Sequence, residues 1–135
     1  MLKVKFFIWC MLHGKVQTRD KLIQKGILIT SICPMCNQVN ETMLHLFFHC
    51  VWAQELWGDV LYTLGREAPN PTRCVSVEKW LLEWPQLHFS DFGKAVWKVV
   101  PYAVIWSIWR ARNDKLFRNI DKGSERVRMT ILGFI

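Results

Sequence analysis

Four side chains with the chemistry of metal ligands lie close together in the first half of the chain: Cys33, Cys36, His45 and Cys50. Thiolate sulfur and imidazole nitrogen are the ligands that Zn²⁺ usually takes in a tetrahedral structural site. A C-x2-C pair can instead be a redox pair, but that interpretation expects a βαβ setting, which this sequence lacks. The spacing C-x2-C-x8-H-x4-C therefore predicts a structural zinc site, with one pair of ligands on a turn and the other on a following helix.

The identity of the fourth ligand depends on how the chain runs after His45. On a straight helix His45 and His49 share a face, whereas His45 and Cys50 are about 140° out of phase. A helix that ends or loosens near Phe48 would bring Cys50 into the site. Thiolate is the stronger zinc ligand, and three thiolates balance the charge of the ion better than two. We therefore favour Cys50, with His49 as the alternative.

Hydrophobic periodicity and capping residues predict helices around this site. The predicted helices cover residues 3–13, 19–25, 42–48, 51–64 and 76–84, then a long helical region from Ser90 or Asp91 to residue 117, and a frayed helix over 125–135. Pro101 should kink or restart the long region, because proline removes a backbone donor from a helix. No stretch alternates strictly between apolar and polar residues, so we expect little β-sheet.

The predicted fold class is mainly α. Residues 65–74 contain Pro69, Asn70 and Pro71 and have the composition of a linker. We expect a small helical zinc-stapled domain over residues 1–64, this linker, and a Trp-rich helical extension over residues 75–135.

The 135-residue chain can bury a real core, because 51% of its residues are hydrophobic and 21% are charged. Eight of the residues are Trp, which bury a large area each. We expect Trp97, Trp106 and Trp109 to pack into the core rather than to stack on nucleic-acid bases.

The net charge of +7 is concentrated near the two ends of the sequence. Residues 1–30 carry six basic side chains against one acidic side chain, and residues 110–128 carry seven against three. Such flanks predict a polyanion partner, RNA or DNA, although exposed Lys and Arg side chains can also serve solubility alone. The candidate nucleic-acid-binding residues are Lys3, Lys5, Lys15, Arg19, Lys21, Lys25, Arg110, Arg112, Lys115 and Arg118.

The five cysteines also bear on the compartment of the protein. An odd count with metal-type spacing argues against a disulfide framework and for an intracellular, reducing compartment, either nucleus or cytoplasm. Cys10 is expected in the core, and Cys74 could be a free surface thiol. No apolar stretch reaches the length of a membrane span, so no membrane partner is expected.

The sequence contains no recognisable catalytic set. It has no Gly-rich phosphate loop, no nucleophile with an evident base and no carboxylate cluster that could hold Mg²⁺. Four protein ligands would also fill the coordination sphere of the zinc ion and leave no position for an activated water. We therefore expect no enzymatic activity.

A denser pattern extends beyond the ligands. It comprises Lys3-Val4-Lys5-Phe6-Phe7-Ile8-Trp9, Thr18, Leu22, Gly26, Cys33, Cys36, Glu41, His45-Leu46-Phe47, Cys50, Ala53 and Trp57. This pattern resembles the zinc-binding domain of plant non-LTR (LINE-type) retrotransposon reverse transcriptases over residues 3–60. A second segment, from Ile105 to Phe117 with Arg112-Asn113 at its centre, resembles the segment that often follows this domain. Cys10 departs from the resemblance, since the family often has Arg at this position.

The resemblance implies the ligand set Cys33, Cys36, His45 and Cys50 and a zinc-binding module that contacts RNA or DNA. A polymerase domain precedes this module in the full polyprotein, yet the chain contains no Tyr-Ala-Asp-Asp-type polymerase motif. We therefore expect a fragment, a relic without retained function or a free-standing copy of the module. The alternative function is a protein-interaction or scaffold module that docks a polymerase domain. The sequence does not indicate an oligomeric state.

Overall fold

The computed structural model describes residues 2–86 and 90–134. Helices make up most of these residues and surround a small loop, the metal-ligand loop, which runs from Cys33 to Glu41. The helices are α1 (Leu2–Leu12), α2 (Arg19–Gln24), the π-helical turn η1 (His45–His49), α3 (Val51–Leu64), the 3₁₀ turn η2 (Pro71–Arg73), α4 (Val77–Leu82), α5 (Asp91–Phe117) and α6 (Ser124–Phe134). Within the described residues the only β-structure is an isolated bridge between Ile32 and Asn40. The predicted mainly α fold is confirmed.

Local sequence signals set most helix ends. α1 is followed by Gly14 and α3 by Gly65, and both glycines adopt a left-handed conformation, with φ of 64°. The hydroxyl groups of Ser76 and Ser90 accept hydrogen bonds from N–H groups in the first turns of α4 and α5. These caps explain why the helix positions agree closely with the prediction, although α4 ends two residues before Trp84.

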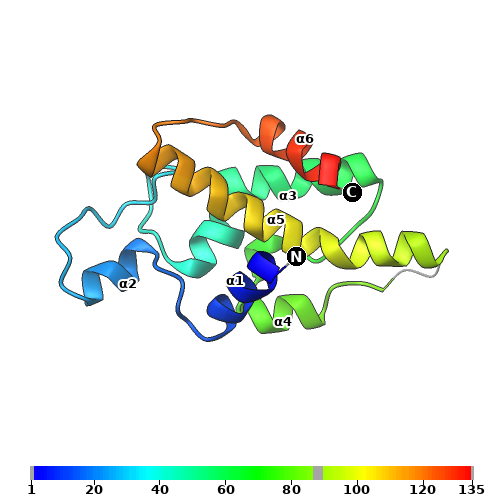
Figure 1. Cartoon of the computed structure of the whole chain (residues 1–135), viewed down its shortest axis with the longest axis horizontal. Helices are drawn as coiled ribbons and strands as arrows, with labels where there is room; N and C mark the ends of the chain where they lie inside the picture. Colours follow the sequence, from blue (N-terminus) through cyan, green and yellow to red (C-terminus); the bar gives the residue numbers. More distant parts are fainter. Residues whose placement is uncertain (1, 87–89, 135) are drawn as a thin grey trace.

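At Pro101 the sequence predicts either a kink or a restart of the helix, and α5 shows the kink. The helix is not restarted there, because all 27 residues from 91 to 117 form one helix with the proline inside. Figure 1 shows that α5 changes direction in its yellow part, around residue 100. A bend of this kind is the expected response to a missing N–H donor inside a helix.

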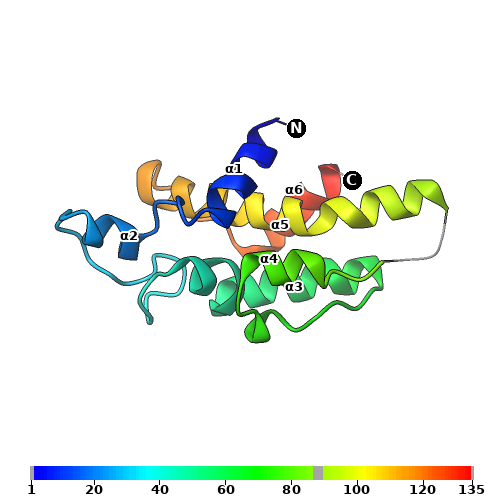
Figure 2. The same ribbon diagram turned by 90° about the horizontal axis from the view of Figure 1, so that it is seen from below.

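α5 is the central element of the fold. It crosses the middle of the molecule and packs against α1, α3 and α6 (Figure 1). In the perpendicular view, α3 and α4 form a layer on one side of α5 (Figure 2), and α1, which packs on α5, also contacts α4. α2 lies toward the same end of the molecule as the orange, C-terminal end of α5 (Figures 1 and 2).

Two aromatic clusters form much of the core, and adjacent residues of η1 enter each of them. Phe47 packs with Phe7 of α1 and with Trp109 of α5. Phe48 packs with Trp57 and Trp80, which belong to α3 and α4. The π-helical turn η1, which carries His45, therefore connects the two aromatic clusters.

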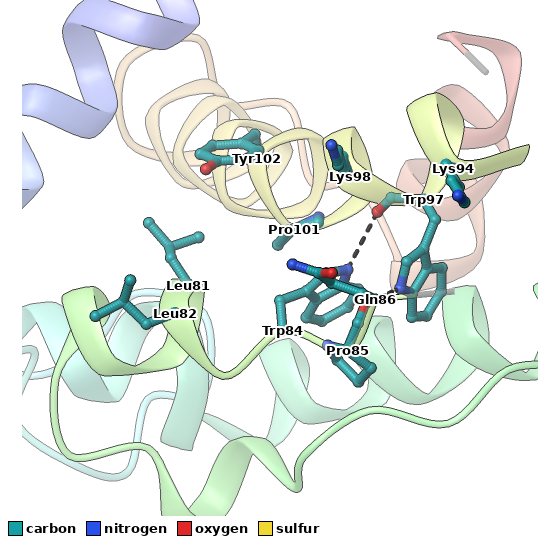
Figure 3. Close-up of a pocket in the computed structure, with 10 residues that line it drawn as sticks. All are labelled: Leu81, Leu82, Trp84, Pro85, Gln86, Lys94, Trp97, Lys98, Pro101 and Tyr102. Atoms are coloured by element: carbon teal, nitrogen blue, oxygen red, sulfur yellow. Dashed lines mark hydrogen bonds between the residues drawn. The ribbon is translucent and has the colours of Figure 1, made fainter. Parts of the chain in front are cut away.

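The second cluster continues from α4 to the N-terminal half of α5. The indole N–H of Trp84 donates to the carbonyl of Trp97 (3.1 Å), and the indole N–H of Trp97 donates to the carbonyl of Pro85 (2.5 Å) (Figure 3). This exchange satisfies two polar groups that burial would otherwise penalise. Trp97 packs in the core as predicted.

The segments before and after residues 65–74 share one hydrophobic core. A single cluster of buried residues contains members from α1, η1, α3, α4, α5 and α6. The division into a domain, a linker and an extension stays a prediction, and the two helical parts are packed together. Over the described part of the chain, no helix combines the length and the apolar character needed to cross a membrane.

Candidate metal centre

The side chains of Cys33, Cys36, His45 and Cys50 converge on one point. Their ligand atoms all lie within 4.8 Å of one another, and Cys36 Sγ is 3.4 Å from His45 Nε2. Cys33, His45 and Cys50 are buried, whereas Cys36 is partly exposed. Three sulfur atoms and one imidazole nitrogen at this separation can surround a single metal ion, and this donor set suits Zn²⁺.

A tight loop holds the first two ligands. The N–H of Cys33 donates to the carbonyl of Val39, and the N–H of Asn37 donates to the carbonyl of Cys33, both at 2.8 Å. Asn37 adopts a left-handed conformation with φ of 57°, which Asn tolerates better than most residues. These bonds close the loop so that Cys33 and Cys36 project from the same turn.

A π-helical turn brings the second pair together. The N–H of Cys50 donates to the carbonyl of His45 at 2.6 Å, which is the i to i+5 bond of a π-helix. Cys50 itself is extended, with φ of −61° and ψ of 137°, and it precedes the first residue of α3. The wider turn removes the phase difference that a straight α-helix would impose between these two residues.

The environment of Cys50 favours a thiolate. A hydrogen bond from the Cys33 side chain lowers the pKa of Cys50, and the N–H groups of Trp52 and Ala53 at the start of α3 lower it further. The same pairing, together with burial, raises the pKa of Cys33. Metal binding would release the proton of the Cys33 thiol.

Burial lowers the pKa of His45, which keeps the imidazole neutral near pH 7. The hydroxyl of Thr42 accepts a hydrogen bond from the backbone N–H of His45 at 3.1 Å. A neutral, positioned ring is the form in which histidine binds a metal.

His49 lies outside the cluster. Its Nε2 is 2.8 Å from the carbonyl oxygen of Cys74, to which the ring N–H donates. This bond fastens η1 to the segment after η2. Cys74 is buried, and its thiol donates to the carbonyl of Ser76, so the expectation of a surface thiol is wrong. Burial raises the pKa of Cys74 to about 11.

A buried ion pair between Glu41 and Arg112 connects the metal-ligand loop to α5. Glu41 accepts hydrogen bonds from Nη2 (2.6 Å) and Nε (3.0 Å) of Arg112 on α5, and from the backbone N–H of Arg19 at the start of α2 (2.8 Å). The guanidinium also lies over the ring of Trp109, 4.8 Å from its centroid. Glu41 therefore ties α2, the metal-ligand loop and α5 together.

This ion pair was not predicted from the sequence. Glu41 and Arg112 are 71 residues apart, and no local pattern links them. Glu41 is part of the pattern that resembles the reverse-transcriptase zinc-binding domain, and Arg112 is part of the segment that resembles the one often following this domain. These resemblances were the only indication in the sequence that the two residues matter. The prediction that Arg112 contributes to a basic surface is wrong, because the residue is only 2% exposed and its charge is neutralised by Glu41.

The other nine candidate cations retain some exposure. The exposed ones are Lys3, Lys5, Lys15, Lys25, Arg110 and Arg118, and the partly exposed ones are Arg19, Lys21 and Lys115. Some have local partners: Arg19 donates to the carbonyl of Thr30, and Arg118 lies 3.6 Å from Asp114.

Comparisons with known proteins agree with this geometry. Residues 1–57 match the family model described as zinc-binding in reverse transcriptase. A protein of Arabidopsis thaliana that is named as a candidate ribonuclease H protein is 23% identical over 129 residues, which are 93% of this chain and 20% of that protein. The chain thus spans about a fifth of the length of this relative. No solved structure matches the chain.

The match ends at Trp57, shortly after the last residue of the cluster, and it includes the loop and the π-helical turn. Residues 1–57 are thus similar to the zinc-binding domain of reverse transcriptases, and they contain all four residues of the cluster.

Proposed function

We propose that this chain is a non-catalytic module in which one structural zinc ion, held by Cys33, Cys36, His45 and Cys50, stabilises a surface that binds RNA or DNA. The zinc ion would supply folding free energy by joining the loop to η1. Four protein ligands would be the pattern of a structural zinc site and would leave no position for an activated water. The thiolates imply a reducing compartment.

The observation that supports the proposal best is the link through Glu41 between α2 and α5, which both carry basic side chains. Glu41 bonds both to the backbone of Arg19 and to Arg112, so the start of α2 lies beside the C-terminal half of α5. Cations that are distant in the sequence, such as Lys21 and Arg110, are thereby carried toward the same end of the molecule. A concentration of positive charge favours a polyanion partner.

The comparisons add independent support. The family description places this kind of domain in reverse transcriptase, and the Arabidopsis relative takes its name from ribonuclease H. Both names refer to proteins that act on nucleic acid. The chain would contribute binding and positioning rather than chemistry.

A salt titration with a charge-reversal variant tests this function. The parent protein should bind a labelled oligonucleotide with an affinity that falls steeply as salt rises, because phosphate contacts release counterions. The variant Lys21→Glu/Lys25→Glu/Arg110→Glu should bind at least about tenfold more weakly at low salt and show a shallower salt dependence. Fluorescence anisotropy at two salt concentrations measures both effects.

The matched control reverses the same number of charges elsewhere. Lys79, Lys94 and Lys98 are exposed on α4 and on the N-terminal half of α5. The variant in which all three are changed to Glu should retain most of the affinity of the parent protein for the oligonucleotide. Equal losses in the two variants, or no binding by the zinc-loaded parent protein, would refute the proposed surface.

A further inference from the structure

α1 exposes a row of aromatic rings. Phe6 and Trp9 are 65% and 46% exposed. Their rings are inclined by only 13° with centroids 6.2 Å apart, and the ring of His13 continues the row at 4.2 Å and 28° from Trp9. Exposed Trp and Phe carry a cost in solubility, so a row of nearly parallel exposed rings points to a flat ligand.

An apolar groove between α1 and α5 adjoins this row. It has a volume of about 660 Å³. Its lining residues are Val4, Lys5, Ile8, Trp9, Leu12, Val99, Tyr102, Ala103, Trp106 and Ser107. Trp9, Tyr102 and Trp106 give it three aromatic side chains from two different helices. The groove can therefore accept planar groups as well as aliphatic ones.

The charged side chains of residues 1–18 are all positive. Lys3 and Lys5 are exposed on α1, and Lys15 Nζ lies 5.3 Å from the centroid of the Trp9 ring. Residues 1–18 contain no acidic side chain, and neither does the lining of the groove. An apolar partner protein would not need this positive rim, whereas a ligand with flat bases on a phosphate backbone matches both features.

We propose that the Phe6-Trp9-His13 row and the α1–α5 groove form a binding site for single-stranded nucleic acid. Unpaired bases stack on Trp9 and enter the groove, and Lys3, Lys5 and Lys15 contact the phosphates. Duplex nucleic acid does not expose the faces of its bases and is bound only through its phosphates. This inference rests on the proposed function and specifies its ligand.

The test compares a 12-nucleotide single strand of mixed sequence with its duplex, by anisotropy at one low salt concentration. Trp9→Ala should weaken binding of the single strand by about 5- to 150-fold, the range found when one stacking side chain is removed. Binding of the duplex should change little. Trp9→Phe should retain most of the affinity, and Phe6→Ala is a second variant that removes a ring from the row.

Tyr62→Ala is the matched control, because Tyr62 is 88% exposed on α3 and lies outside the groove. Zinc content and thermal midpoint of each variant show whether it is folded. If Trp9→Ala binds the single strand as tightly as Tyr62→Ala and the parent protein do, the proposed site is wrong and the proposed function stands. If the parent protein binds neither nucleic acid, both fall. Self-association of the parent protein that Trp9→Ala abolishes would assign the groove to a second copy and overturn the inference.

Discussion

The carboxylate of Glu41 and the guanidinium of Arg112 are almost completely removed from solvent, with side-chain exposures of 0% and 3%. Two nearly parallel hydrogen bonds join them, and the backbone N–H of Arg19 supplies a third donor to Glu41. A buried charge whose partner is lost has no compensation from water. The pair therefore makes the positions of the loop and of α5 depend on each other.

Replacement of either partner should be strongly destabilising. Glu41→Gln or Arg112→Leu should each lower the free energy of unfolding by about 3 kcal/mol, because each leaves the other group buried without its partner. The double variant should lose much less than the sum of the two. Urea unfolding followed by circular dichroism measures all three.

The exposed pair Lys79–Glu83 is the control for this cycle. Its atoms are 3.9 Å apart and both side chains are more than half exposed. Lys79→Ala should cost less than about 0.5 kcal/mol. Additive losses at Glu41 and Arg112 would mean that the two residues stabilise the fold independently.

At the scale of elements, the connection between α5 and α6 depends on Asp114. Lys122, in the segment between the two helices, lies 2.8 Å from this carboxylate, and Arg118 lies 3.6 Å from it. The hydrogen bond with Lys122 holds the pKa of Asp114 below its usual value. A depressed pKa stabilises the fold above the unfolded pKa of about 4, and this contribution is lost as the pH falls through the folded pKa.

Lys122→Met should therefore destabilise the protein at pH 7 by up to about 1 kcal/mol, since the pair is only partly shielded from water. The difference from the parent protein should shrink as the pH falls below about 4. Urea midpoints of both proteins across this range provide the measurement. Arg126→Met, which removes an exposed charge of α6, should show no such convergence.

The elements also show how far sequence patterns determine this fold. α3 was predicted with its observed ends, because Gly65 and a helical apolar repeat define it. The π-helical turn could not be predicted, since nothing local distinguishes it from an α-helix. Sequence reasoning required only that the helix loosen near Phe48, and the bond from the N–H of Cys50 to the carbonyl of His45 is the form that this loosening takes.

The ion pair between Glu41 and Arg112 was the main feature that the sequence could not predict. The spacing of Cys33, Cys36, His45 and Cys50 was enough to locate a candidate metal site, but the burial of Arg112 depends on Glu41 at a distant position. A charged residue on a helix is usually exposed, so composition alone misassigned it. The nucleic-acid surface stays a proposal, because it depends on cations of α2 and α5 that are far apart in the sequence.

At the scale of the whole molecule, the metal centre and the aromatic core are continuous. η1 carries His45 and also sends Phe47 and Phe48 into the two clusters that hold α1, α3, α4 and α5. Loss of the metal should therefore reach well beyond the loop. We expect chelation to lower the thermal midpoint and to weaken the near-ultraviolet signal of the tryptophans, because a structural zinc ion contributes directly to folding.

Metal content of the purified chain tests the central claim most directly. The parent protein and His49→Ala should each bind about one equivalent of zinc, whereas Cys50→Ala should lose it, because four ligands form the site and His49 bonds to Cys74 instead. The visible spectrum of the cobalt-substituted parent protein should show three thiolate ligands, which requires no variant to fold. Zinc retained by Cys50→Ala but lost by His49→Ala, with a two-thiolate cobalt spectrum, would contradict the account.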